Sequence, residues 1–164
     1  HRIEDTLSAT YAAVEEGIVI GGGAALIKAG MKVASKEIKP PSTYIAHEFK
    51  VGVEILLKAL EAPLKQIAIN AGKDDGSVIV DEIKKSKGNE GYDANADQIV
   101  KDMFEVGIID PVKVTRTGLE RAASVAAILL TTEVAIADEP KDDKPMMPGG
   151  GMGGMGGGMG DMDN

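Results

Sequence analysis

Three consecutive glycines, Gly21-Gly22-Gly23, precede a short apolar segment and are the first feature that could do chemistry. Glycine lets a backbone approach a ligand closely, and the free N–H groups at a helix start favour a phosphate. The run lacks the Gly-Lys-Ser/Thr ending of a P-loop and the spacing of a Rossmann fingerprint. Two interpretations therefore stay open, a phosphate-binding turn and a tight corner without a ligand.

Carboxylates are the second feature with chemical potential. Asp110 precedes Pro111 at the expected start of a helix, where an aspartate usually serves as N-cap. The alternative is a carboxylate that accepts ligand hydroxyls such as those of ribose. Asp5 looks like an ordinary exposed helix carboxylate, and His47 has no second suitable histidine nearby, so we expect no metal site. These residues by themselves predict a nucleotide binder and nothing narrower.

Composition excludes several classes of function. The 164 residues carry 26 acidic and 18 basic side chains, a net charge of −8, and only two Phe, three Tyr and no Trp. Few aromatics and an acidic balance argue against a nucleic-acid partner. No apolar run approaches the roughly 18–20 residues of a membrane span, and the absence of cysteine fits a reducing compartment. We expect a soluble intracellular domain and, since the chain begins at His1 in an apparent helix, a piece of a longer protein.

Hydrophobic periodicity predicts a mostly helical body that positions these residues. Apolar residues recur at helical spacing from Ile3 to Ile18, with Gly17 as C-cap, and again from Ile45 to Leu60. Further helices are predicted over Ala24–Ala29 closed by Gly30, from Pro63 towards Gly72, over Val78–Lys85 with Ser77 as N-cap, over Ala96–Val106, and from Pro111 onwards. The stretch 122–130 is almost wholly apolar, which predicts burial on all sides.

The C-terminal part changes character after Ala137. Val134 and Ile136 alternate with small or polar residues, which predicts a short strand at about 131–138 that needs a partner strand. Residues 138–164 are rich in Gly, Met and Pro, a composition typical of a disordered tail. The sequence alone therefore predicts a mainly α fold with minor β.

Several motifs, in order along the whole chain, resemble the C-terminal segment of GroEL-type group I chaperonins. They are Ile3-Glu4-Asp5-Thr6-Leu7, Ala12-Ala13-Val14-Glu15-Glu16-Gly17, Gly21-Gly22-Gly23-Ala24-Ala25-Leu26, Leu60-Glu61-Ala62-Pro63-Leu64, Gly91-Tyr92-Asp93-Ala94, Ile109-Asp110-Pro111-Val112-Lys113-Val114-Thr115-Arg116, Ala122-Ala123-Ser124-Val125-Ala126, Thr131-Thr132-Glu133 and the Gly-Gly-Met repeats of the tail. The resemblance implies a double ring of seven-subunit rings that hydrolyses ATP, encloses unfolded polypeptides and works with a co-chaperonin lid.

By that resemblance, residues 1–16 end an intermediate hinge domain, residues 17–137 form the C-terminal, helical half of an equatorial ATP-binding domain, and residues 138–164 form the tail. Asp5 takes the position of the catalytic aspartate, and a carboxylate on a hinge helix can reach the nucleotide only when the domain closes. Gly22 falls near the nucleotide, Asp93, Ala94 and Asn95 fall on the stretch that lines adenine, and Asp110 falls on the ribose-binding carboxylate. Glu16 and Arg116 match a pair that bridges the two domains.

Two departures from the family limit these expectations. The adenine stretch commonly reads Asn-Ala-Ala, whereas this chain has Asp93-Ala94-Asn95, so only a backbone contact carries over. The N-terminal half of the family, with its phosphate and magnesium loop and apical domain, has no counterpart here. We therefore expect ATP/ADP and Mg²⁺ as cofactors, magnesium ligands mostly outside this chain, and an inactive isolated fragment.

Two other classes of function remain open at this stage. One is a non-catalytic helical scaffold or interaction module with a flexible Met/Gly tail, and the other is a small independent nucleotide-binding enzyme. For location, the resemblance favours the bacterial cytoplasm, with the mitochondrial matrix as the alternative. No nucleic acid and no membrane is expected among the partners.

Overall fold

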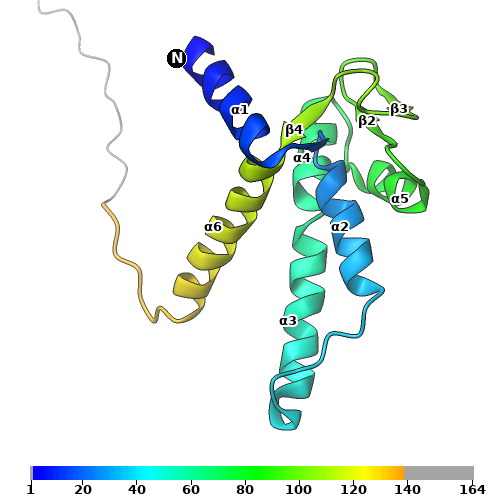
Figure 1. Cartoon of the computed structure of the whole chain (residues 1–164). Helices are drawn as coiled ribbons and strands as arrows, with labels where there is room; N and C mark the ends of the chain where they lie inside the picture. Colours follow the sequence, from blue (N-terminus) through cyan, green and yellow to red (C-terminus); the bar gives the residue numbers. More distant parts are fainter. Residues whose placement is uncertain (1, 139–164) are drawn as a thin grey trace, which may run out of the picture. The chain divides into compact units, whose positions relative to one another are not determined.

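The computed structural model describes residues 2–138. The chain divides into two units, His1–Leu130 and Thr131–Asn164, and the second is described only as far as Asp138. The first unit contains the helices α1 (Arg2–Glu16), α2 (Ala24–Ala34), α3 (Ala46–Ala59), α4 (Ala62–Asn70), α5 (Ser77–Lys85) and α6 (Val112–Leu130), with a 3₁₀ turn at Thr43–Ile45 (Figure 1). Its strands are β1 (Ile18–Ile20), β2 (Gly91–Asp93), β3 (Gln98–Val100) and β4 (Ile109–Pro111). The expected mainly α fold is confirmed.

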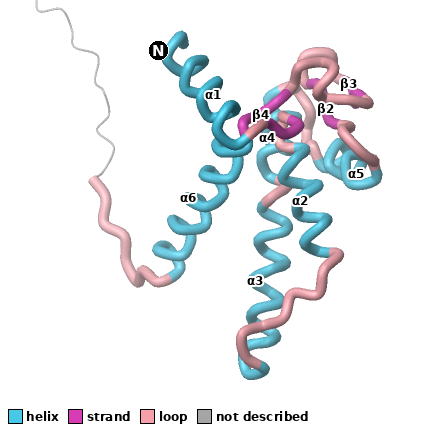
Figure 2. The backbone as a smooth tube through the Cα atoms, in the orientation of Figure 1, coloured by secondary structure: helices cyan, strands magenta, loops and turns pink. Residues whose placement is uncertain are grey.

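The strands form two separate antiparallel pairs, which Figure 2 marks in magenta among the helices. In the first pair, β1 and β4 place Val19 opposite Asp110 and Ile20 opposite Ile109. In the second, β2 and β3 form a hairpin with Tyr92 opposite Ile99. The first pair matters most for function, because it brings Asp110 beside the chain that leads into the glycine run.

The hydrophobic core lies under α2, α4, α5 and the hairpin. Because its members come from segments up to about eighty residues apart, they hold the glycine run, the hairpin and the two short helices together. Leu64, Ile83, Met103 and Val80 are the largest fully buried side chains. The full set is Ile20, Ala24, Ile27, Leu64, Ala68, Ile79, Val80, Ile83, Tyr92 and Met103.

The predicted helix over Ala96–Val106 is wrong, because the chain forms the β2–β3 hairpin here and then turns from Met103 to Gly107. Asp93 Oδ1 accepts hydrogen bonds from the backbone N–H groups of Asn95 (2.9 Å) and Ala96 (3.2 Å). Such side-chain bonds compete with helical ones and favour a turn. Asp97 completes it with φ 52°, the left-handed region in which a helix cannot continue.

Two helix boundaries also differ from the prediction. Gly30 does not close α2, which runs on to Ala34; Gly30 is instead a buried contact, since a Cβ there would lie 3.1 Å from Leu60 Cδ1. Gly76, rather than Ser77, takes the N-cap position of α5. A Cβ at Gly76 would lie 2.8 Å from Lys65 Cα, so the close approach of α5 to α4 requires glycine there.

The predicted burial of 122–130 is wrong for the part of the chain that the structure describes. The segment is helical, as the C-terminal half of α6, but every residue in it is exposed. Leu129 is 63 % exposed and Leu130 is 87 % exposed. Periodicity and propensity determine the helix locally, whereas burial needs a partner that residues 2–138 do not provide.

The predicted strand over about 131–138 is also wrong as far as the structure shows it. Val134 and Ile136 have no ladder partner, because each of the two sheets within residues 2–138 contains only the two strands named above. An isolated strand cannot satisfy its backbone groups, so no strand forms without a pairing edge. The predicted disordered tail lies, apart from Asp138, outside the described residues.

Candidate functional site

The glycine run forms a tight turn between β1 and α2. Gly22 (φ 65°) and Gly23 (φ 78°) both have left-handed backbone conformations, which residues other than glycine rarely adopt. A Cβ at Gly23 would lie 2.9 Å from the backbone N of Leu64, and one at Gly21 would lie 3.1 Å from the backbone of Ile108. The corner interpretation therefore explains Gly21 and Gly23 through close packing.

Gly22 differs from its two neighbours, since a Cβ there would make only ordinary contacts. The nearest atoms are Tyr92 O and Met103 Cε, both at 3.5 Å. Its N–H is also close enough to the Asp110 carboxylate to lower the pKa of that group. Gly22 is therefore the residue at which the turn meets both the hairpin and a titratable side chain.

Asp110 belongs to β4 and not to a helix cap. The helix α6 begins at Val112, and Asp110 lies opposite Val19 in the β1–β4 pair. The N-cap interpretation is therefore wrong. Partial burial raises the pKa of Asp110, and the nearby Gly22 N–H offsets part of that rise. A group that donated further hydrogen bonds to this carboxylate would stabilise its charged form.

The stretch Asp93-Ala94-Asn95 forms the end of β2 and the beginning of the hairpin turn. Asp93 uses its carboxylate to fix the turn, Ala94 packs partly against the core, and Asn95 is exposed. Tyr92, the preceding residue, has its backbone oxygen 3.5 Å from the position that a Gly22 Cβ would take. Gly22 and Asp110 therefore lie together, and the backbone just before this stretch passes beside them.

Asp5 does not join this group. It is an exposed residue in the first turn of α1, twelve positions before Gly17. At 1.5 Å of rise per helical residue, it lies about 17 Å along the helix axis from Glu16, the last residue of α1. In this conformation Asp5 is apart from the glycine turn.

The end of α1 is held to the start of α6 by ion pairs. Arg116 donates from Nη2 to Glu16 Oε1 at 2.6 Å and from Nε to Glu16 Oε2 at 3.1 Å, and it also contacts Glu120. The hydrogen bonds from Arg116 lower the pKa of Glu16. Lys113 pairs with Glu15 in parallel. The expected contact of Glu16 with Arg116 is confirmed, whereas the Glu15–Lys113 pair was not predicted.

An apolar cleft of about 820 Å³ opens beside the glycine turn. Gly22, Gly23 and Asp110 line it, together with side chains of α3 and α6 that the sequence analysis did not connect with the site. Most of its lining is aliphatic, including Leu26, Ile55, Leu56, Leu60, Ile67, Val114, Leu119, Ala123 and Leu130. The polar groups therefore occupy one part of an otherwise apolar wall, the usual composition of a pocket for an organic ligand.

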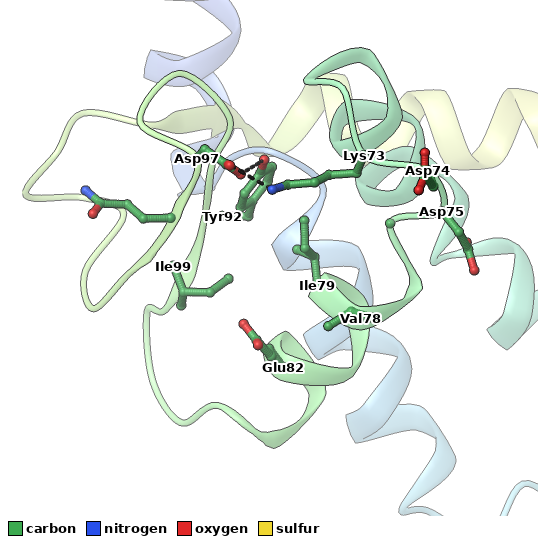
Figure 3. Close-up of a pocket in the computed structure, with 11 residues that line it drawn as sticks. Lys73, Asp74, Asp75, Val78, Ile79, Glu82, Tyr92, Asp97 and Ile99 are labelled. Atoms are coloured by element: carbon green, nitrogen blue, oxygen red, sulfur yellow. Dashed lines mark hydrogen bonds and ion pairs between the residues drawn. The ribbon is translucent and has the colours of Figure 1, made fainter.

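A second pocket, of about 450 Å³, lies between α5 and the hairpin (Figure 3). On its wall Tyr92 Oη donates to Asp97 Oδ1 at 2.8 Å, and Lys73 Nζ donates to Asp97 Oδ2 at 2.7 Å. These two bonds lower the pKa of Asp97, and burial raises the pKa of Tyr92. The sequence analysis missed this network, because Lys73 lies 24 positions before Asp97 and nothing local links them.

Residues 2–138 also bear on the question of a metal site and of a membrane span. They contain no group of three His, Cys, Asp or Glu side chains arranged to hold a metal ion. None of the helices in the same range combines the length and the apolar character that crossing a bilayer requires.

Comparison with known protein families gives a match that covers most of the chain. A model of the TCP-1/cpn60 chaperonin family matches residues 1–140. This range includes all of the glycine turn, the hairpin, Asp110 and the ion pairs that attach α1.

Proposed function

Because the chain belongs to the TCP-1/cpn60 chaperonin family, a family of protein-folding chaperones, we propose that it supplies the nucleoside side of a chaperonin ATP site. The observation that supports this most is that Gly22 and Asp110 line one cleft, with Tyr92 O 3.5 Å from the position that a Gly22 Cβ would take. The glycine turn and the ribose-binding candidate therefore lie together, and the backbone that leads into the adenine-binding candidate passes beside them.

In the proposed site each residue has a separate task. The backbone at Gly22 lies near the phosphates, and the Asp110 carboxylate accepts hydrogen bonds from the ribose hydroxyls. The backbone of Asp93, Ala94 and Asn95 lines the adenine. Ribose hydroxyls would donate to a carboxylate whose pKa burial has raised, so binding should lower the pKa of Asp110.

The residues fit ATP or ADP in part and do not fit Mg²⁺. A glycine turn beside a partly buried carboxylate and an apolar wall suits a nucleoside. Among residues 2–138, however, no cluster has the ligands for a metal ion. We therefore propose that the magnesium ligands belong mostly to another part of a longer subunit, and that the 164 residues alone do not hydrolyse ATP.

Asp5 is proposed as the catalytic aspartate, which orients or activates the water that attacks the γ-phosphate. Since it lies about 17 Å along the helix axis from the end of α1, and the glycine turn follows only after β1, it can act only after α1 has moved. The pairs Glu16–Arg116 and Glu15–Lys113 attach the end of α1 to α6 and mark where such a helix would pivot. This agrees with a boundary between a hinge domain, 1–16, and an equatorial domain, 17–137, which stays a proposal.

The assembly is proposed on the same basis. The subunit would form a double ring of seven-membered rings, enclose unfolded polypeptides under a co-chaperonin lid, and work in the bacterial cytoplasm or, alternatively, the mitochondrial matrix. The exposed apolar side chains of α3 and α6 support a role within a larger assembly. They equally favour the competing function, a helical scaffold that binds no nucleotide, so a binding experiment has to separate the two.

The test is a titration of the chain with ATP to millimolar concentration, followed by the NMR signals of the backbone amides. We expect shifts at Gly22 and at Asp93–Asn95. We expect Asp110→Asn to weaken the binding of ATP at least about tenfold, because it removes a charged hydrogen-bond acceptor. Asp81→Asn, on an exposed position of α5, is the matched control.

Two results would contradict the proposal. If the shifts were absent, or were unchanged in Asp110→Asn, the scaffold function would replace it. If the chain hydrolysed ATP with magnesium and lost this activity in Asp5→Ala, the site would be complete within these residues, and the independent enzyme would be the better description.

A further inference from the structure

The hairpin that carries Asp93, Ala94 and Asn95 is attached to the rest of the site by three side chains, Lys73, Asp97 and Tyr92, which we call the latch. Figure 3 shows Asp97 between the other two, with one carboxylate oxygen for each. Tyr92 lies on β2, Asp97 ends the turn just before β3, and Lys73 follows α4. The latch therefore ties both strands of the hairpin to a helix outside it.

Each member of the latch has a fixed backbone. Tyr92 is only 3 % exposed and pairs with Ile99 across the hairpin. Lys73 donates its N–H to Ala68 O at 3.1 Å, after Gly72 (φ 92°) has ended α4. Asp97, with φ 52°, is the one residue other than glycine with a positive φ among residues 2–138. A strained backbone held by two side-chain bonds is typical of a position with a role beyond packing.

The latch also completes a closed series of contacts around the glycine turn. The first turn of α4 contacts Gly23, where a Cβ would meet the backbone N of Leu64 at 2.9 Å. The far end of α4 contacts the hairpin through Lys73 and Asp97. The hairpin returns to Gly22 through Tyr92 O. The nine residues of α4 thus lie between the glycine turn and the latch, whose Lys73 follows the helix.

We propose that Lys73, Asp97 and Tyr92 are positioning residues that set the distance between the hairpin turn 93–96 and the glycine turn. The inference rests on the proposed function, because that distance would match the separation of adenine from the phosphates. The latch then decides how well the site recognises the base, while the glycine turn alone faces the phosphate end. None of the three side chains needs to contact the nucleotide.

The first measurement needs no ligand. Hydrogen exchange of the Asn95 and Ala96 amides, which bond to Asp93, reports opening of the hairpin turn. Lys73→Met and Asp97→Asn should each speed that exchange about threefold, the range expected for a half-exposed ion pair, and leave the amides of α2 unchanged. Asn tolerates the left-handed conformation and can still accept from Tyr92, so Asp97→Asn removes the charge without disturbing the turn. Lys101→Met, near the other end of the hairpin, is the control.

The second measurement separates positioning from general stability. The wild-type chain and Asp97→Asn are titrated with ATP and with inorganic triphosphate, which has no base. We expect about threefold weaker binding of ATP and unchanged binding of triphosphate, because only the base end has been released. A variant that merely loosened the fold would weaken both ligands alike.

The outcomes keep the two proposals apart. Unchanged exchange at Asn95 and Ala96 in both variants, or equal weakening of ATP and triphosphate, would overturn the latch as a positioning device. If the wild-type chain shows no ATP shifts at Gly22 and at the hairpin, the proposed nucleotide site fails instead, and the exchange data still decide whether the latch holds the hairpin.

Discussion

Two regions of the first unit differ sharply in how their apolar residues are used. In the packed region, formed by α2, α4, α5 and the β2–β3 hairpin, Leu64 and Ile83 are fully buried. In the open region, formed by α1, α3 and α6, no described residue is buried, although the helices carry regular apolar stripes. Helical periodicity and burial are therefore separate properties of a segment. Only the packed region positions the candidate site by its own contacts.

The largest expected contrast comes from shortening one leucine in each region. Leu64→Ala should lower the free energy of unfolding by about 3 kcal/mol, because it removes buried methyl groups and leaves a cavity. Leu129→Ala should change it by less than about 0.5 kcal/mol, because that side chain is 63 % exposed. Urea unfolding followed by circular dichroism measures both. Equal losses would mean that α6 is covered in solution and would remove the distinction between the regions.

A pair of glycines tests the same contrast through the backbone. Gly23→Ala should cost about 2 kcal/mol, since the residue has a φ of 78° and its Cβ would press on Leu64 N. Gly52→Ala, within the open helix α3, should stabilise by about 0.8 kcal/mol, because no atom lies within 4 Å of the new Cβ and alanine favours a helix. Thermal unfolding of the two variants checks the opposite signs. A loss in Gly52→Ala would show that α3 has a close neighbour in solution.

The smallest expected effect concerns the attachment of α1 and depends on pH. Arg116 lowers the pKa of Glu16 below its ordinary value of 4.5, so the folded state binds the proton more weakly than the unfolded state. The stabilisation is therefore fully present above pH 4.5 and is lost as the pH falls through the lowered pKa. Hydrogen exchange of the α1 amides, measured between about pH 5 and 3, should show α1 loosening from α6.

The matched variants for this measurement both lie on α6. Arg116→Met should abolish the pH dependence of α1, while Arg121→Met, an exposed residue on the same helix, should preserve it. If the protection factors of the α1 amides, which compare the observed exchange with the intrinsic rate at each pH, stayed constant throughout this range, packing rather than the ion pairs would hold α1 in place.

Local patterns predicted the elements that local physics determines. The stripes in α1 and α3, Pro63 in the first turn of α4, and the glycines at 17 and 72 with positive φ all give the expected helices and ends. The prediction failed over Ala96–Val106, where Asp93 fixes a turn and Asp97 takes a left-handed conformation. The composition of this segment suits a helix, but the side-chain hydrogen bonds of Asp93 stabilise a hairpin turn instead.

Hydrophobic periodicity predicted the helical character of the chain, and ordered motifs along it predicted its family. Gly22 and Asp110 were also identified as separate candidates. That these two residues line one cleft, that Lys73 pairs with Asp97 and that the apolar end of α6 is exposed became visible only in the folded chain. Helices form through hydrogen bonds between residues four apart, whereas these features depend on which distant segments come to lie side by side.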